Sequence, residues 1–458
     1  MPDRSSHEIP VTRGELRDLQ IDGLGDGPDA MARIGGYVVF VPGALPGERV
    51  RVRITSASRK FGRGELIAVK RSAPDRVVAP CRHFLACGGC HRQHTDYPAQ
   101  LASKQALVQK TIDRALGPRT IPVAPTIAAA APYGQRHKVA LHLYNGASGA
   151  IQPGFHRLRS TAFVPVHECP ASEPHALALA LHAVDLLRET RAPAFDPESA
   201  PDGLLRTVLV RRTTLGESHL VIVATRATIP GLDRILARLH EAGATTISTN
   251  HNDRQLAVLL GPHTVVRSGP PRIRERLLGV DYLLSPDAFF QTSPHAAAAI
   301  VRFALDWLAP RATDEVADLY CGGGLLTLPL ARLAKRVRAV EANPAALADC
   351  RAAADAQGIT NVTWHRSDVA RELGAGLPAV DLVVADPPRS GLPDSVVTAL
   401  AAMRPRRLVH IACDLGSLGR DLAALAAAGF APRTVVPLDM FPQTSHVETL
   451  VGLDRPGP

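Results

Sequence analysis

The sequence predicts a multi-domain protein with an N-terminal OB-like β-barrel, a central α+β domain and a C-terminal α/β Rossmann-like domain. The chain has 458 residues, about three times the length of a typical domain. Residues 11–72 contain short alternating strands with glycine turns, whereas strands alternate with helices from about residue 285. We therefore expect domains over residues 1–74, 75–280 and 281–458.

The composition favours a soluble protein with a polyanionic partner. Apolar residues make up 46% of the chain, which supports sizeable cores and argues against disorder. No apolar run approaches the ~20 residues that span a bilayer, and residues 1–18 lack the apolar core of a secretory signal. We expect a cytoplasmic protein without membrane contact. The net charge of +9 suits nucleic acid, although an arginine-rich composition from a GC-rich genome would produce the same value.

The first domain is expected to be a barrel with a cationic face. Residues 48–54 alternate strictly, with Val50, Val52 and Ile54 on one face and arginines on the other. Residues 58–64 form a basic turn with one aromatic side chain. Such features are typical of an OB-type nucleic-acid platform, and a charged strand face in solvent is the alternative.

The remaining elements follow from periodicity. In the central domain we expect helices over 98–116 and 231–242, and strands over 139–143, 208–210 and 219–224. Ser293 and Pro294 predict the start of a helix that ends at Leu308. Seven strands are expected in the C-terminal domain, and their alternation with helices implies a parallel sheet covered on both faces: Val316–Leu319, Val337–Val340, Val362–Trp364, Asp381–Ala385, Leu408–Ala412, Thr434–Leu438 and Val447–Gly452.

A glycine turn after the first of these strands predicts a cofactor site. Residues 318–324 read DLYCGGG, and Glu341 ends the next strand, where a carboxylate can accept ribose hydroxyls. Thr327 replaces the last glycine of a dinucleotide motif, and no phosphate-binding lysine follows. The turn therefore favours S-adenosylmethionine, whose sulfonium is cationic. Three further residues suit the adenosine or its tail: Tyr320, Asp368 and Asp386.

Two further strand ends carry candidate catalytic groups. The fourth strand ends in Asp386-Pro-Pro-Arg389, where arginine replaces the aromatic residue of amine methyltransferases. The fifth ends at Cys413, and Glu448 lies in the last strand. A thiol, a carboxylate and a methyl donor fit methylation of carbon 5 of uracil. Thiolate addition at carbon 6 makes carbon 5 nucleophilic, and a base then removes its proton.

With these motifs the chain resembles the RNA (uracil-5-)-methyltransferases that have an N-terminal TRAM barrel and an iron–sulfur cluster. The resemblance extends from about residue 11 to 452. It rests on Phe289-Phe-Gln291, DLYCGGG, ADPPRSG, Ala412-Cys413 and Phe441-Pro…His446-Val-Glu448. It implies Cys413 as nucleophile and Glu448 as base, with cofactor contacts from Gln291, Tyr320, Glu341, Asp368 and Asp386.

One departure from the family concerns the nucleophile. The family usually has Asn-Pro or Asp-Pro after this cysteine, whereas Asp414-Leu415 follows Cys413 here. Loss of the proline is expected to loosen the loop. A non-catalytic RNA-binding protein on a methyltransferase scaffold is the alternative that this departure supports, and the intact catalytic set argues against it.

A cluster of cysteines predicts a metal site. Cys81, Cys87 and Cys90 lie within ten residues, and Cys169 is a natural fourth ligand. Four thiolates suit a 4Fe–4S cluster or tetrahedral zinc, and His91 and His94 could complete a zinc site instead. The resemblance implies the 4Fe–4S cluster, since the subgroup's cluster cysteines fall on these positions.

The expected partner is structured RNA. A target uridine must leave its stack to reach the thiol, and residues 133–138 and 155–159 are candidate RNA contacts, with ordinary turns as the alternative. The domain architecture resembles enzymes that act on 23S rRNA, and a tRNA T-loop uridine is the rival substrate. We expect a monomer.

Overall fold

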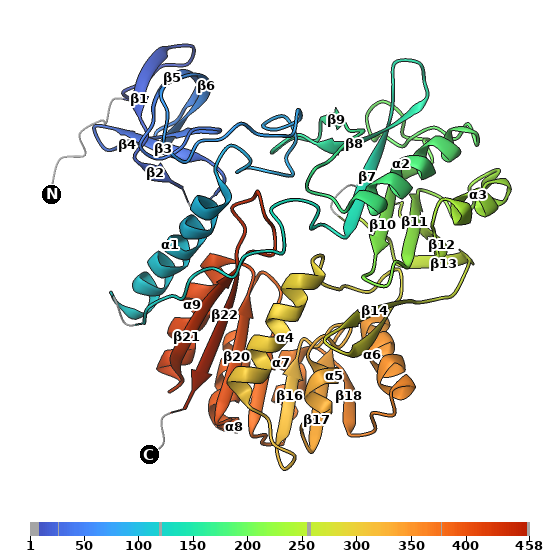
Figure 1. Ribbon diagram of the computed structural model, residues 1–458. Helices are drawn as coiled ribbons and strands as arrows, with labels where there is room; N and C mark the ends of the chain where they lie inside the picture. Colours follow the sequence, from blue (N-terminus) through green and yellow to red (C-terminus); the bar gives the residue numbers. More distant parts are fainter. Residues whose placement is uncertain (1–8, 26, 119–120, 254–257, 377, 456–458) are drawn as a thin grey trace. The chain divides into compact units, whose positions relative to one another are not determined.

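The computed structural model describes residues 9–25, 27–118, 121–253, 258–376 and 378–455 (Figure 1). Residues 1–8, part of the stretch in which no secretory signal is expected, lie outside them. The chain forms two compact units. The first comprises Met1–Ser103, His156–Val164 and Gln443–Ser445, and the second comprises Lys104–Phe155, Pro165–Pro442 and His446–Pro458.

The first unit contains a six-stranded sheet of order β1-β5-β6-β4-β3-β2. Its strands are β1 (Leu16–Gln20), β2 (Gly23–Leu24), β3 (Ala30–Ile34), β4 (Tyr37–Val41), β5 (Arg49–Ala57) and β6 (Phe61–Arg71). The predicted alternation is confirmed in β5, where Val50, Val52 and Ile54 are buried while the arginines between them are exposed. This small sheet has its own apolar core.

A buried carboxylate joins this sheet to the segment that directly follows β6 in the same unit. Glu48, which has no exposed surface, accepts hydrogen bonds from the backbone N–H of Leu45 (2.8 Å) and Ala73 (3.2 Å). Arg76 pairs with it and also donates to the carbonyl of Gly43 (2.7 Å). A buried charge is tolerated because it is paired and fully hydrogen-bonded.

The central part of the second unit is a sheet of order β13-β12-β11-β10-β7-β8-β9. Its strands are β7 (Lys138–Asn145), β8 (Ile151–His156), β9 (Phe163–Pro165), β10 (Leu205–Arg212), β11 (Ser218–Ala224), β12 (Thr246–His251) and β13 (His263–Ser268). Helices α2 (Pro174–Arg188) and α3 (Leu236–Glu241) pack on one face. The helix predicted over 231–242 is split into the 3-10 turn η1 (Leu232–Arg234) and α3, because Ile235 between them has a φ of −107°.

The C-terminal sheet has seven strands, as predicted, in the order β18-β17-β16-β19-β20-β22-β21. They are β16 (Glu315–Leu319), β17 (Arg336–Glu341), β18 (Val362–Arg366), β19 (Leu382–Ala385), β20 (Arg407–Ala412), β21 (Ala431–Leu438) and β22 (Glu448–Asp454). The expectation of an all-parallel sheet is wrong for one strand: β22 runs antiparallel to both β20 and β21. The short connection from β21 lets the chain return as a neighbouring antiparallel strand, whereas a parallel strand needs a longer crossover.

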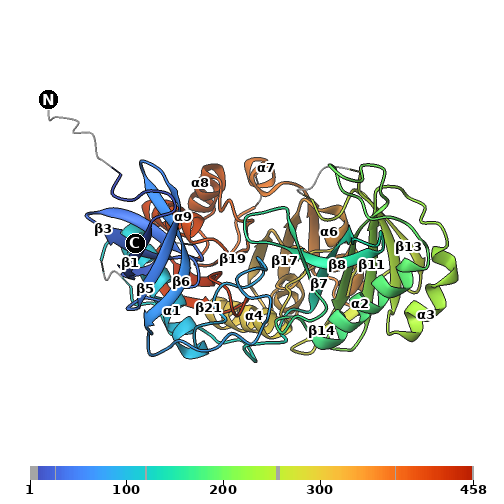
Figure 2. The same ribbon diagram turned by 90° about the horizontal axis from the view of Figure 1, so that it is seen from above.

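Helices cover both faces of this sheet. One core holds residues of α4 (Pro294–Leu308), α5 (Thr327–Ala331) and α6 (Pro344–Ala356), and another holds residues of α7 (Val369–Gly374), α8 (Asp394–Met403) and α9 (Leu415–Ala427). Figure 2 shows α4 on the opposite side of the sheet from α7 and α8. Ser293 caps α4 as predicted, and the predicted helix over 98–116 is α1 (Tyr97–Leu116).

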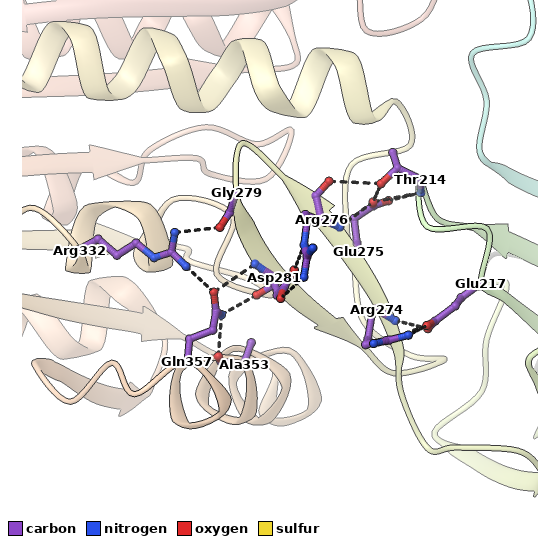
Figure 3. A network of polar contacts seen from close by, with 10 residues as sticks. All are labelled: Thr214, Glu217, Arg274, Glu275, Arg276, Gly279, Asp281, Arg332, Ala353 and Gln357. Atoms are coloured by element: carbon purple, nitrogen blue, oxygen red, sulfur yellow. Dashed lines mark hydrogen bonds and ion pairs between the residues drawn. The ribbon is translucent and has the colours of Figure 1, made fainter.

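A hairpin of β14 (Ile273–Leu277) and β15 (Val280–Leu284) connects the two sheets of the second unit. Polar contacts hold it on both sides (Figure 3). The buried Glu275 accepts from the backbone N–H of Thr214 (3.0 Å), in the turn between β10 and β11. Gln357, after α6, accepts from the backbone N–H of Asp281 (3.1 Å) and donates to its carbonyl (2.7 Å). These hydrogen bonds therefore fix the hairpin, and with it the start of the segment that leads into α4.

Within the described ranges, none of the helices combines the length and the apolar character that crossing a bilayer requires.

Candidate active site

The glycine turn after β16 has a backbone conformation that favours small residues. Tyr320 (φ 65°), Gly322 and Gly324 all have positive φ. Glu341, at the end of β17, accepts a hydrogen bond from the backbone N–H of Gly322 at 2.9 Å. The predicted ribose-binding carboxylate therefore lies directly against the turn, and its oxygens keep lone pairs for a ligand.

Three acidic residues lie close together at this edge of the sheet. Burial, together with the charges of Asp386 and Glu341, raises the pKa of Asp318 to about 7. The hydroxyl of Thr327 donates to the Asp318 carboxylate at 2.6 Å and lowers the pKa in part. Burial also raises the pKa of Asp386. Sequence reasoning includes Asp318 in the glycine motif without assigning it a role. A cation bound here would relieve the repulsion among these carboxylates.

Two more predicted contacts lie beside the turn. Burial raises the pKa of Tyr320 to about 12, and the nearby Asp368 carboxylate contributes. Asp368 caps α7 by accepting from the backbone N–H of Arg371 at 3.1 Å. The structure therefore brings Tyr320, Glu341 and Asp368 to one end of the sheet, as the sequence predicts.

The segment before α4 packs against the glycine turn. A Cβ atom built on Gly323 would lie 3.6 Å from the carbonyl oxygen of Phe289 and 3.8 Å from the ring of Phe290. That ring packs on Tyr282 (5.3 Å between centroids), whose hydroxyl donates to Leu325 O at 3.1 Å. Gln291 directly follows this anchored pair, which brings it near the predicted cofactor turn.

The antiparallel strand β22 brings the two predicted catalytic residues together. In its register with β20, Ala412 pairs with Thr449. The next step of that register puts Cys413, just past the end of β20, opposite Glu448, the first residue of β22. Glu448 is 5% exposed, and the cysteine is half-buried. The thiol and the carboxyl group are therefore neighbours.

The electrostatics of this pair follow from burial and from mutual repulsion. Burial raises the pKa of Cys413, and the charges of Glu448 and Asp386 raise it further, whereas Arg389 lowers it. Burial likewise raises the pKa of Glu448, and Asp386 adds to the rise. Arg389, to which sequence reasoning assigns no role, partly offsets both shifts. Three groups that can become anionic share this site.

The helix after Cys413, the predicted nucleophile, is capped without the proline that the family usually has. Asp414 accepts from the backbone N–H of Gly416 (2.9 Å) and Ser417 (3.0 Å), and the hydroxyl of Ser417 donates to Asp414 O (3.1 Å). Leu415 is the first residue of α9, where a backbone N–H has no partner within the helix in any case. The aspartate cap therefore holds the start of α9 where the family has proline, and the expected loosening stays a prediction.

Helix α9 also forms hydrogen bonds with the loop that carries Asp386 and Arg389. Arg420 donates to Ser390 O at 2.6 Å, and Asp421 accepts from the backbone N–H of Leu392 at 3.0 Å. A Cβ atom on Gly391 would lie 2.5 Å from the Asp421 carboxylate, which explains the glycine in ADPPRSG. Sequence reasoning did not assign this role to Asp421, although the glycine signals a close approach.

The predicted metal ligands lie in different units. Cys81, Cys87 and Cys90 belong to the first unit and Cys169 to the second, and all four are half-buried. The backbone N–H of Gly89 donates to the sulfur of Cys87 at 3.4 Å, a contact that suits a thiolate ligand. In the part of the chain that the structure describes, histidine, cysteine and acidic side chains form no group of three or more arranged to hold a metal ion. The cluster stays a prediction.

Family models match both ends of the chain. Residues 10–67 match the TRAM domain, and residues 272–456 match the tRNA (Uracil-5-)-methyltransferase model. The second match contains the glycine turn, the nucleophile loop and β22, which are the parts of the fold that form the site.

Relatives match over nearly the full length. An RNA methyltransferase of Halalkalibacterium halodurans is 31% identical over 98% of this chain and 99% of its own. One of Listeria innocua is 32% identical over 98% and 100%. A Pyrococcus abyssi tRNA (uracil-54, C5)-methyltransferase, solved with S-adenosyl-L-homocysteine, has the same fold, with a TM-score of 0.75, 24% identity, and coverage of 95% of this chain and 100% of that one. The chain belongs to the RNA methyltransferases of the (uracil-5-)-methyltransferase family that carry an N-terminal TRAM domain.

Proposed function

We propose that the protein transfers a methyl group from S-adenosylmethionine to carbon 5 of a specific uridine in structured RNA, with 23S rRNA as the favoured substrate. The observation that supports this most is the antiparallel register of β20 and β22, which extends to put Cys413 opposite Glu448, together with the effect of the Glu448 charge on the pKa of the thiol. Carbon 5 methylation needs a nucleophile and a base on neighbouring positions, because both act on adjacent carbons of one ring.

The residues act in sequence. The Cys413 thiolate adds to carbon 6 of uracil, and the electron pair of the 5,6 double bond becomes available at carbon 5. S-adenosylmethionine, when bound, would supply the methyl group that carbon 5 attacks, and its sulfur would keep the electron pair of the broken carbon–sulfur bond and leave as S-adenosylhomocysteine. The Glu448 carboxylate then takes the proton from carbon 5, the double bond re-forms and the thiolate leaves. The Cys413 thiolate is thus regenerated at once, Glu448 returns to the carboxylate form when it passes the carbon 5 proton to solvent, and no net electrons are consumed.

The charges of the site suit a cationic methyl donor. The charges of Glu448 and Asp386 raise the pKa of Cys413, and the charge of Asp386 raises the pKa of Glu448, so a positive sulfonium beside them favours their deprotonated forms. These forms are the ones that the reaction needs. We propose that the donor is held by Gln291, Tyr320, Glu341, Asp368 and Asp386.

RNA binding is supported by the TRAM domain, whose β5 exposes Arg49, Arg51 and Arg53. Such arginines contact phosphates without reading sequence. We propose that the protein works as a monomer in the cytoplasm. A tRNA T-loop uridine is the alternative substrate, which the name of the Pyrococcus abyssi structure favours.

Mass spectrometry of RNA from a strain that lacks the gene tests the proposal. We expect one 5-methyluridine to disappear from 23S rRNA, while tRNA keeps its modification. Loss from tRNA alone would establish the alternative substrate. Unchanged 5-methyluridine in both RNAs, with normal expression of the protein in the parent strain, would contradict the proposed function.

The proposal includes a 4Fe–4S cluster on Cys81, Cys87, Cys90 and Cys169. The three clustered thiols and the N–H···S hydrogen bond to Cys87 support it. A cluster there would cross-link the chain and take no part in methyl transfer.

Anaerobic purification should therefore yield a brown protein with about four iron atoms per chain. The Cys87→Ala variant should lose the iron, whereas Cys413→Ala, outside the ligand set, should keep it. A colourless protein with one zinc ion per chain would identify zinc as the metal instead.

A further inference from the structure

The connection between β21 and β22 ends at the proposed base. It contains Gln443, which is 2% exposed and has a φ of 69°. A residue other than glycine rarely adopts this left-handed backbone conformation unless surrounding contacts stabilise it. The structure should therefore contain groups that fix Gln443, five residues before Glu448.

Those groups come from α1 and from the end of the cysteine-rich loop, which here means residues 81–92. The carbonyl oxygen of Gln443 accepts from the backbone N–H of His91 (2.8 Å) and of Arg92 (3.0 Å). Gln100 donates through Nε2 to Gln443 Oε1 (3.0 Å), and Gln100 Oε1 accepts from the backbone N–H of Gln443 (3.1 Å). Each residue thus both donates to and accepts from its partner.

Gln100 is also the link to the cysteine-rich loop. It is 2% exposed, and its amide donates to Arg92 O (3.1 Å) and to Thr95 O (2.9 Å). His91 directly follows Cys90, the last of the three clustered cysteines. One buried amide therefore holds both the end of that loop and the turn at Gln443.

The first half of the connection is held in a similar way. Lys104, four residues after Gln100 on α1, forms a buried ion pair with Asp439 and donates to Phe441 O at 3.2 Å. The connection is thus held at Asp439 and Phe441 and again at Gln443.

We infer that Gln443 and Gln100 are positioning residues, which hold the turn before Glu448 so that its carboxyl group reaches the carbon 5 proton. The inference rests on the proposed function. It also assigns the end of the cysteine-rich loop a task, because His91 and Arg92 fix the same turn through their backbone N–H groups.

The test separates the step that needs Cys413 from the step that needs Glu448. Gln443→Met keeps the side-chain length and leaves the backbone hydrogen bonds, and Gln100→Ala removes the shared amide. Both variants should form the covalent complex with 5-fluorouridine RNA within about twofold of the unchanged protein. On ordinary RNA, release of the methylated covalent complex should slow by roughly ten- to a hundredfold, as expected for a misplaced catalytic group.

Gln105→Ala is the matched control, since Gln105 lies on the same helix but donates to Val123 O (2.9 Å). It should release product at the normal rate. Hydrogen exchange of residues 441–450, measured without RNA, should accelerate in Gln100→Ala and not in the control. Normal release by both variants, or an equal loss of complex formation and release, would overturn the inference. Failure of the unchanged protein to form any covalent complex would instead refute the proposed function.

Discussion

Replacing Cys413 by alanine should abolish methylation, with a loss of at least about 10⁴-fold, as is typical when a covalent nucleophile is removed. Carbon 5 of uracil is a weak nucleophile until a group adds at carbon 6, and no other residue at the end of β20 offers a thiol. The measurement is transfer of a labelled methyl group to RNA under saturating methyl donor. The same variant should fail to form a covalent complex with 5-fluorouridine RNA, in which fluorine cannot leave as a proton does.

Two controls show whether the loss is chemical. Cys413→Ser keeps the size of the side chain but has a hydroxyl in place of the thiol, so it should also be inactive while folding normally. Both variants should bind the methyl donor with near-normal affinity, because the glycine turn and Glu341 are unchanged. A covalent complex that still forms with Cys413→Ala would show that another residue is the nucleophile.

The Glu448→Gln variant should stop at a later point of the reaction. Glutamine keeps the shape of the side chain but cannot take the carbon 5 proton, so the methylated RNA should stay attached to Cys413. We expect the covalent complex to accumulate on ordinary RNA, with product release slowed by about 10²- to 10⁴-fold, the usual contribution of a general base. Gel electrophoresis under denaturing conditions, with labelled RNA, measures this complex.

The pH dependence of complex formation provides a second readout of the same variant. The negative charge of Glu448 raises the pKa of Cys413, so removing that charge lowers the pKa and makes the thiolate available at lower pH. The rate of covalent complex formation with 5-fluorouridine RNA should therefore begin to rise at lower pH in Glu448→Gln than in the unchanged protein. An identical profile would show that the two groups do not interact, and rapid release would show that Glu448 is not the base.

Much of this site could be predicted from the sequence because it lies at strand ends. The glycine turn, Glu341, Asp386 and Cys413 each follow an apolar strand, and parallel strands bring their carboxyl ends to one edge. The strict alternation in β5 and the cap at Ser293 are local patterns of the same kind. Periodicity and capping depend on nearby residues, so they can be deduced without knowing the fold.

Other parts could not be predicted, because they depend on contacts between distant residues. Asp421 accepts a hydrogen bond from the loop next to Gly391, and Gln100 donates one to Gln443. In each pair the partners are remote in the chain, and glutamine or aspartate in a helix is usually a surface residue. Sequence reasoning expects Leu415 to loosen the loop after Cys413, and only the folded α9 shows that Asp414 caps the helix there.

The sequence by itself predicted the types of the proposed reacting groups: a thiol at Cys413, a carboxylate at Glu448 and a glycine turn for the methyl donor. The tertiary structure alone decided the direction and register of β22 that put Glu448 opposite Cys413. If β22 were parallel to its neighbours, its first residue would lie at the amino end of the sheet, away from Cys413. The strand instead runs antiparallel to β20, since a short connection from β21 can only return it in that direction.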